Sequence, residues 1–309
     1  MVSPFLATQP AVVPDSLLTL AKSAKTPRVA IARAGAPLPM QAAKQATDAG
    51  IMIPMFFGEQ DAITAEALAL DWDISPYTLH HCVGEQAAGM AAAKACGEGR
   101  ADILMKGHLH TDVFMKAALN RDNGLRTGGR LVHVFHISHP TGGAPILLSD
   151  GAVNVAPDLE TRQASAAICV DMLHKLGTKN PKVAFLSATE SVIPAVPSSG
   201  DARSLRDWAR KNIQGAEFSG PLALDLALSP QSAEIKGMTD DPVAGRADVL
   251  IVPDIVTGNT LFKAMVYMTG ACAAGVVMGA KVPILLTSRA DPAAGRMASV
   301  ALAAIVSGS

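Results

Sequence analysis

LIVPDIVTGNTLFK, residues Leu250 to Lys263, begins as an apolar run and changes abruptly to small polar and charged residues. The apolar part suits a strand that is buried on both faces of a parallel sheet. A second stretch, ILLTSRAD from Ile284 to Asp291, repeats the pattern. In an open α/β sheet ligands bind where such strands end, so the two stretches predict one binding site. Ser288 and Arg289 follow the second strand side by side, and a hydroxyl beside a guanidinium suits a phosphate group.

Apolar runs of this kind alternate with Ala-rich helical stretches along the whole chain. The expected strands are residues 28–33, 50–57, 101–106, 182–188, 247–254 and 282–288. The expected helices are Glu85–Ala95, Thr111–Leu119, Thr161–Lys175, Ser204–Lys211 and Asn259–Met268. This alternation predicts an α/β fold with a mainly parallel sheet.

Residues 130–150 break the alternation. RLVHVFHI alternates partly, the turn-rich SHPTGG follows, and APILLSD returns, which predicts a β-hairpin. Such an insertion marks a domain change or a dimer edge, so we place a boundary near Gly128 and Gly129. The last strand comes too late to begin a new domain and is expected to return to the first one. We therefore expect a discontinuous first lobe, residues 1–128 and 278–309, and a second lobe, residues 129–277, with the hairpin and the dimer contacts.

Composition narrows the classes of function. Lys and Arg number 26 against 27 Asp and Glu, so no basic patch indicates nucleic acid or an acidic membrane surface, and a small molecule is the expected partner. The cysteines are far apart with no CxxC pair, which fits neither a disulfide framework nor a zinc site. The sequence shows no apolar run that could span a bilayer and no secretory signal. We therefore expect a protein of the cytoplasm.

Basic side chains gather after one of the expected strands, in the sequence ADILMKGHLHT. Lys106, His108 and His110 follow the strand directly, and Lys116 lies on the next expected helix. Thr111 is expected to cap this helix, whose first amide groups would face an anion. Taken singly, Thr111 could act only as a cap and each lysine as a solvated surface charge. The clustering favours an anion site.

Hydroxyl groups follow another expected strand, in FLSATES. Ser187 and Thr189 can donate to phosphoryl or carbonyl oxygens, and an ordinary turn with self-satisfied hydroxyls is an equal alternative. DGAVN, residues 150–154, contains turn residues and is expected to be structural.

The strand end in LIVPDIVTGNTLFK carries the same kind of chemistry. Thr257 and Gly258 are expected to form a turn, and Asn259 or Thr260 to cap the helix that carries Lys263. A single capping residue is common, whereas four strand ends with similar polar groups indicate a shared site.

Familiar catalytic signatures are missing from the sequence. It has no GxSxG elbow, no GxxxxGK[ST] loop, no HExxH pair and no GxGxxG fingerprint, which disfavours serine hydrolases, P-loop kinases, zincins and standard NAD dehydrogenases. The spacing of His133, His136 and His139 raises the question of a metal site. On a strand His133 and His139 point away from His136, so no metal site is expected there.

With these motifs in order, the chain resembles the phosphate acetyltransferase and phosphate butyryltransferase family over most of its length. The matching pieces are KGHLHT with Lys116 beyond it, DGAVN, SATES, GRADVLIVPDIVTGNTLFK and TSRAD. The resemblance implies a two-lobed α/β/α fold shared with isocitrate and isopropylmalate dehydrogenases, no metal or nicotinamide cofactor, and usually a homodimer. It also implies reversible acyl transfer between coenzyme A and inorganic phosphate, so acyl-CoA and phosphate are the expected substrates and no tightly bound cofactor is expected.

The resemblance also assigns roles to residues. Ser288 and Arg289 become contacts of the phosphate and of the transition state. Lys116 stands where many acetyltransferases have Arg, which keeps the charge and loses the bidentate geometry. Further expected ligands are Lys106, Thr111, Ser187, Thr189, Thr257, Asn259 and Lys263.

One departure from the family concerns the base. Acetyltransferases carry an Asp seven positions after the Ser of the SR pair, proposed to deprotonate the coenzyme A thiol, and this chain has Gly295 there. Asp291 and His110 are the candidates for that role, although a carboxylate near Arg289 should be a weak base. Capture of the thiolate without a dedicated base is a third possibility.

Gly295 also leaves open a different class of function on the same fold, a non-catalytic sensor of acyl phosphate or coenzyme A. A dehydrogenase of this fold is disfavoured because no grouping of metal-binding carboxylates is visible in the sequence. The length of the acyl chain stays open, since it depends on the shape of a pocket.

Overall fold

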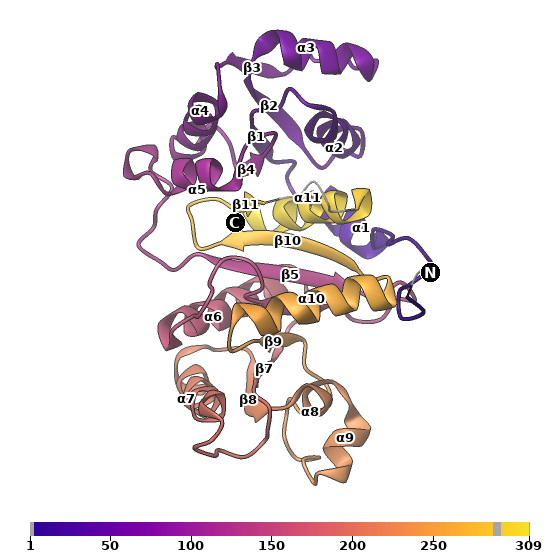
Figure 1. Cartoon of the computed structure of the whole chain (residues 1–309), viewed down its shortest axis with the longest axis vertical. Helices are drawn as coiled ribbons and strands as arrows, with labels where there is room; N and C mark the ends of the chain where they lie inside the picture. Colours follow the sequence, from indigo (N-terminus) through magenta and orange to yellow (C-terminus); the bar gives the residue numbers. More distant parts are fainter. Residues whose placement is uncertain (1–2, 287–291, 309) are drawn as a thin grey trace. The chain divides into compact units, whose positions relative to one another are not determined.

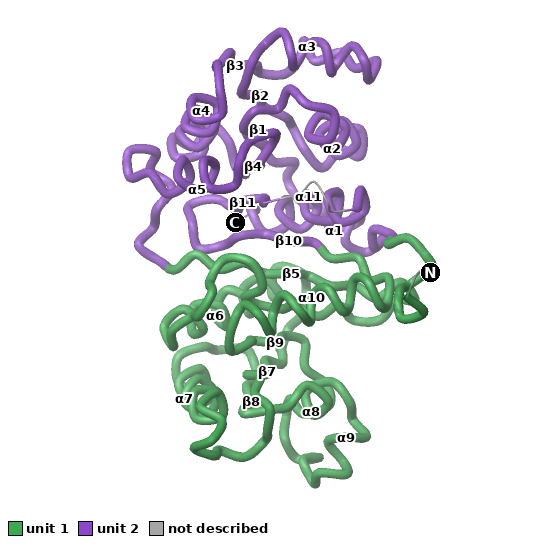
Figure 2. Tube along the Cα trace, viewed as in Figure 1, with its two compact units in different colours: residues 1–11, 130–273 green, residues 12–129, 274–309 purple. Residues whose placement is uncertain are grey.

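The computed structural model of the chain describes residues 3–286 and 292–308. The chain folds into two compact units, called unit 1 (residues 1–11 and 130–273) and unit 2 (residues 12–129 and 274–309), which Figure 2 shows in green and purple. Residues 1–11, which the sequence places in the first lobe, belong to unit 1. The Ala7 amide donates to the Tyr267 carbonyl at 2.8 Å, which ties this segment to the unit.

Unit 2 is built on a mainly parallel sheet in the order β3-β2-β1-β4-β11-β10. Its strands are β1 (Arg28–Ala32), β2 (Ile53–Gly58), β3 (Thr78–His81), β4 (Ile103–Lys106), β10 (Cys272–Met278) and β11 (Ile284–Leu285). Its helices are α1 (Asp15–Ser23), α2 (Pro37–Asp48), α3 (Gln60–Ala69), α4 (Glu85–Gly97), α5 (Thr111–Leu119) and α11 (Ala293–Ser307), with a short 3-10 helix at Arg121–Asn123 (Figure 1).

Strand β1 lies in the middle of this sheet because its sequence, RVAIA, is apolar on both faces. Its last four residues are buried, as expected for a parallel strand covered on both sides. Ala30 pairs with Met55 of β2 on one side and with Leu104 of β4 on the other. The chain therefore leaves β1 in one direction along the sheet and returns on the opposite side, so the carboxyl ends of β1 and β4 border a topological switch point.

Unit 1 contains the predicted hairpin and a parallel sheet in the order β5-β6-β9-β7-β8. Its strands are β5 (Val132–Ser138), β6 (Ile146–Ser149), β7 (Lys182–Leu186), β8 (Glu217–Leu222) and β9 (Val249–Ile251). Its helices are α6 (Leu159–Lys175), α7 (Pro197–Asn212), α8 (Leu224–Leu228), α9 (Pro230–Ile235) and α10 (Ile255–Thr269). Strands β5 and β6 pair antiparallel, with Phe135 opposite Leu148, and β6, β9, β7 and β8 run parallel. The predicted α/β class, mainly parallel sheet and hairpin are confirmed.

Helix ends follow local chemistry that the sequence only partly reveals. Helix α5 has the predicted bounds, whereas α7 begins at Pro197, seven residues before the predicted start. Proline suits the first position of a helix because its ring fixes φ and its missing N–H has no intrahelical partner there. In the part of the chain that the structure describes, no helix has both the length and the apolar character needed to cross a membrane.

Candidate active site

Lys106, His108 and His110 follow β4 at the carboxyl edge of the sheet in unit 2. Lys106 is the last residue of β4, and its relative exposure is 9%. Gly107 then passes close to the end of β1, where its amide donates to the Ala32 carbonyl at 2.9 Å. A Cβ at Gly107 would collide with the Ala32 carbonyl oxygen, so the close approach, rather than a sharp turn, requires glycine here.

The predicted cap of helix α5 is wrong by one residue. The helix begins at Thr111, and the N-cap position belongs to His110, which makes no side-chain capping bond. Instead, the His110 amide donates to Glu85 Oε2 at 3.0 Å, and His110 Nδ1 lies 2.9 Å from the same oxygen. Glu85, at the start of helix α4, thus holds both the amide and the ring of the N-cap residue His110.

Glu85 also joins His110 to Arg33, which follows β1. Arg33 Nη1 lies 2.9 Å from Glu85 Oε1, and Arg33 Nη2 lies 3.4 Å from Glu59 Oε1. Hydrogen bonds from the amide and ring of His110 lower the pKa of Glu85, so this carboxylate stays ionised at neutral pH. The sequence analysis missed Arg33, Glu59 and Glu85. The only local signal was the charged residue that ends RVAIAR.

Lys116 lies on the exposed side of α5. Its side chain is 80% exposed and pairs with Asp112, one turn earlier, at 3.5 Å. Together with Glu85, Lys116 borders a groove of about 370 Å³ between α4 and α5. Lys116 is therefore available to solvent, while Lys106 is buried at the strand end.

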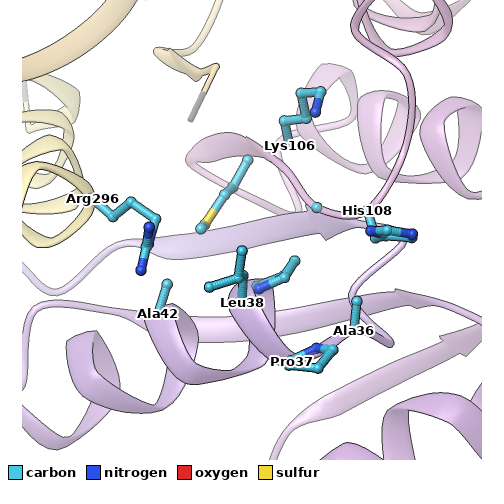
Figure 3. Close-up of a pocket in the computed structure, with 10 residues that line it drawn as sticks. Ala36, Pro37, Leu38, Ala42, Lys106, His108 and Arg296 are labelled. Atoms are coloured by element: carbon cyan, nitrogen blue, oxygen red, sulfur yellow. The ribbon is translucent and has the colours of Figure 1, made fainter. Parts of the chain in front are cut away.

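A pocket opens beside Lys106, between the segment after β1 and the end of β4. It has a volume of about 220 Å³, and His108 and Arg296 of helix α11 also line it (Figure 3). Arg296 was not among the predicted residues, because nothing in the sequence of α11 distinguishes it from a surface arginine. The pocket therefore lies at the carboxyl edge of the sheet in unit 2, beside the ends of β1 and β4.

Three polar segments of unit 1 also meet at one edge of a sheet. DGAVN follows β6, SATES follows β7, and PDIVTGN follows β9, which lies between β6 and β7. These strands are parallel, with Ser149 opposite Ile251 and Phe185 opposite Ile251, so the three segments leave the sheet on the same side. The structure therefore brings these three segments to one edge of the sheet in unit 1.

The DGAVN loop is held by Asp150, in agreement with its structural role. Asp150 is 3% exposed, and one carboxylate oxygen accepts from the amides of Ala152 and Val153 at 2.9 Å each. The other oxygen accepts from the His133 amide at 2.9 Å and from the Asn154 side chain at 2.7 Å. Both carboxylate oxygens are therefore engaged in fixing the loop.

Helix α10 begins earlier than the sequence predicts, and its cap is neither Asn259 nor Thr260. Asp254 is the N-cap, and its carboxylate accepts from the Thr257 amide at 2.8 Å and from the Thr257 hydroxyl at 3.0 Å. Thr257 and Asn259 therefore lie in the first turns of the helix rather than in a loop. The Asn259 side chain donates to the Gly151 carbonyl at 3.2 Å, and Lys263 is exposed.

The hydroxyls of SATES make local contacts. Ser187 Oγ lies 2.9 Å from Ser198 Oγ, and Thr189 Oγ1 accepts from the Ser191 amide at 3.2 Å. Glu190 pairs with Lys236 at 2.9 Å. Ser187 is a half-buried residue beside the start of α7, so its hydroxyl remains close to the strand end.

Two of the three histidines around the hairpin are buried, and the third, His139, is exposed. His133 and His136 are each 4% exposed, and burial lowers the pKa of His136 to about 4. Burial likewise lowers the pKa of His133, against the opposing effect of the nearby Asp150 carboxylate. Within residues 3–286 and 292–308, no group of three or more His, Cys, Asp or Glu side chains is arranged to hold a metal ion.

Ser288, Arg289 and Asp291 lie outside the described residues. The strand that leads to them, β11, is described, and Leu285 pairs with Met105, the residue before Lys106. Gly295, where the acetyltransferases have an Asp, lies in the first turn of α11 and is buried. Its carbonyl accepts from Ser299 Oγ at 2.7 Å.

The sequence of this chain is similar to those of known enzymes. The sequence profile of the phosphate acetyl/butaryl transferase family matches residues 83–304. The phosphate butyryltransferase of Clostridium acetobutylicum is 35% identical over 95% of this chain and 98% of its own length. The phosphate acetyltransferase of Rhizobium meliloti is 38% identical over 84% of this chain and 83% of its own length.

The fold agrees with a solved structure as well. A branched-chain phosphotransacylase from Enterococcus faecalis V583 superimposes with a TM-score of 0.81 at 32% identity, over 91% of this chain and 98% of that one. Sequence profile, full-length relatives and fold point to the same family. This chain belongs to the phosphate acetyl/butyryl transferase family.

Proposed function

We propose that this chain catalyses the reversible transfer of a short acyl group between coenzyme A and inorganic phosphate. A phosphate oxygen attacks the thioester carbonyl, forming a C–O bond, and the C–S bond breaks. Coenzyme A leaves as a thiolate and becomes the free thiol with the proton that the attacking hydrogen phosphate loses, and the product is an acyl phosphate. The electrostatic demand is high, because a dianion approaches a carbonyl oxygen that gains negative charge in the transition state.

One observation carries this proposal. The family match spans residues 83–304 and so contains every motif that the sequence places at a strand end, from KGHLHT to TSRAD. The curated relatives named above are phosphate butyryl- and acetyltransferases, and each aligns over most of its own length. Neither is named as a sensor, so these relatives do not support the alternative hypothesis of a non-catalytic sensor.

Ser288 and Arg289 are proposed to bind the phosphate and to stabilise the charge that develops in the transition state. Lys106 and Lys116 add positive charge, the first near the end of β4 and the second on the exposed face of α5. Further proposed contacts with phosphate or coenzyme A come from Thr111, Ser187, Thr189, Thr257, Asn259 and Lys263.

In the reverse direction, the base that deprotonates the coenzyme A thiol is proposed to be His110, with Asp291 as the alternative. Glu85 holds Nδ1 of His110 at 2.9 Å, which favours the proton on Nδ1 and leaves Nε2 as the acceptor of the ring. This is the arrangement in which a carboxylate fixes the tautomer of a catalytic histidine. Asp291 lies outside the described residues. A carboxylate two positions from an arginine in the sequence is expected to be a weaker base.

Acyl-CoA is proposed to act as a substrate, with no tightly bound cofactor.

A homodimer is also proposed. It is supported by helix α10, in which Gly258 is the only buried residue. Its apolar side chains Val256, Tyr267 and Met268 are 71%, 54% and 49% exposed, and a partner subunit could cover them. A cytoplasmic location is proposed because Cys82, Cys96, Cys169 and Cys272 are free cysteines.

A thiol-release assay tests the proposed reaction. The protein is mixed with acetyl-CoA or butyryl-CoA, and the free thiol is followed with and without phosphate, with sulfate as the matched anion control. We expect thiol release that requires phosphate. Release at the same rate in sulfate would indicate thioester hydrolysis instead, and no release with any short acyl-CoA would refute an enzyme of this class.

A further inference from the structure

The pocket beside Lys106 lies at the topological switch point of unit 2. It is bordered by Ala36, which follows β1, and by Lys106, Gly107 and His108 at the end of β4. Strands β1 and β4 are neighbours in the sheet, and the chain proceeds from β1 to β2 on the side away from β4. Open α/β sheets bind their ligands in this crevice, outside the carboxyl ends of the strands. The position alone marks the pocket as a ligand site.

The start of helix α2 makes this crevice unusual. In dinucleotide-binding folds the helix after the first strand presents free backbone N–H groups to a pyrophosphate. Here Pro37 and Pro39 occupy the first and third positions of the helix, and neither has a backbone N–H. Leu38, between them, is the only one of the first three helical residues that can donate. This end of α2 therefore presents apolar surface rather than a phosphate cradle.

The lining of the pocket agrees with that conclusion. Leu38, Ala42 and Met105 form apolar walls together with the two prolines, and no acidic residue is among the described residues that line the pocket. Arg296 supplies positive charge at its border, and Figure 3 shows Arg296 reaching from α11 toward Ala42, whereas the Lys106 side chain extends away from Leu38 and Ala42. An apolar pocket with a cationic group at one side fits a small molecule that has a hydrocarbon part and an electron-rich end.

The volume limits the size of that molecule. The pocket measures about 220 Å³, and an apolar protein cavity of roughly 150 Å³ suffices to bind benzene. There is consequently room for a straight or branched chain of four or five carbons, whereas an acetyl group would leave most of the apolar wall without contact.

We propose that this pocket receives the hydrocarbon chain of the acyl group, with its carbonyl end toward Arg296. The proposal rests on the proposed acyl transfer and adds to it the class of acyl group, an aliphatic chain of four or five carbons in preference to acetyl. Leu38, Ala42 and Met105 are then the residues that set chain length.

Two substitutions test the pocket from opposite directions. Ala42→Leu fills it, and Leu38→Ala enlarges it, while Gln41→Leu adds the same leucine at the neighbouring exposed position of α2 as a matched control. For each protein, kcat/KM is measured with acyl-CoAs of two to six carbons and phosphate. One methylene in an apolar pocket changes kcat/KM by roughly 10- to 200-fold.

We expect Ala42→Leu to lower the ratio of kcat/KM for butyryl-CoA over acetyl-CoA by at least ~10-fold. Leu38→Ala should raise the ratio for hexanoyl-CoA over butyryl-CoA by a similar factor, and it decides the matter if Ala42→Leu does not fold. Gln41→Leu should leave both ratios within about twofold of the parent.

Two failures are distinguishable. If the parent protein transfers acyl groups to phosphate and neither pocket variant changes the chain-length ratios, the pocket assignment is wrong and the proposed function stands. If the parent protein releases no thiol with any of the acyl-CoAs, the proposed function is wrong, and the pocket assignment is wrong with it.

Discussion

Gly258 occupies the same position in its helix as Gly200, yet we expect substitution by alanine to change stability differently at the two sites. It is the fourth residue of α10, and Gly200 is the fourth residue of α7. A Cβ at Gly258 would lie against the Asp150 carbonyl oxygen and 2.9 Å from Gly151 Cα, whereas a Cβ at Gly200 would meet nothing within 4 Å. The DGAVN loop and α10 must therefore separate by at least about half an ångström to accept alanine at Gly258.

Both substitutions to alanine gain the same helix propensity, about 0.5–1 kcal/mol. The difference between the two variants then isolates the clash, for which overpacking predicts about 1–3 kcal/mol. We expect Gly200→Ala to be more stable than the parent and Gly258→Ala to be less stable than Gly200→Ala by that amount. The cost arises from backbone atoms on both sides, which cannot rotate away as a flexible side chain can.

Urea unfolding followed by tryptophan fluorescence measures this difference. The chain has two tryptophans, Trp72 in unit 2 and Trp208 on α7 in unit 1. A Trp72→Phe background leaves Trp208 as the reporter of the unit that carries both glycines. Equal free energies of unfolding for Gly200→Ala and Gly258→Ala, within about 0.5 kcal/mol, would refute the close packing of α10 on the DGAVN loop.

Further predictions concern pH and the catalytic groups. Burial lowers the pKa of His136 from 6.5 to about 4, so between these pH values the unfolded chain takes up a proton that the folded chain does not. The contribution of His136 to the free energy of unfolding should fall by about 3 kcal/mol as pH drops through this range, and His136→Gln should remove that part of the slope in urea titrations; an unchanged slope would contradict the burial argument. Arg289→Ala should lower turnover at least ~100-fold in the thiol assay, and near-normal turnover would exclude Arg289 from the mechanism. Asp291→Asn should cost less than Arg289→Ala if Asp291 only orients the arginine, whereas an equal loss would make it a direct participant. His110→Ala should lower kcat by ~100-fold or more in the thiol assay, and turnover equal to the parent's would reassign the base.

The parts of the fold that depend on local sequence were predictable. Strands such as RVAIA are apolar on both faces, and SHPTGG separates two strand-like runs, so the parallel strands and the hairpin could be predicted from periodicity and turn chemistry. Helix α10 shows where this reasoning ends. Asp254 and Asn259 are both suitable N-cap residues, so the local sequence does not decide where α10 begins. The helix begins after Asp254, and Gly258 in its first turn packs on the DGAVN loop, which is more than a hundred residues away in the chain.

Local sequence patterns likewise identify only some residues of the candidate site. Lys106 and His110 follow a strand in one motif, so a local pattern identifies them. Glu85 and Arg33 are 52 residues apart, and the contact between them exists only because β1 and the start of α4 meet at one edge of the sheet. Periodicity carries no information on such contacts. The pocket at the switch point depends on the order of the strands in the same way.

The formation of an acyl phosphate is the most direct test of the central claim, because free thiol alone does not distinguish phosphate transfer from hydrolysis. Butyryl-CoA and inorganic phosphate are incubated with the protein, and the reaction is followed by ³¹P NMR. We predict a new acyl phosphate resonance that grows in step with the free thiol, and that disappears when excess coenzyme A is added. Release of thiol with inorganic phosphate as the only phosphate species outside coenzyme A would contradict the account.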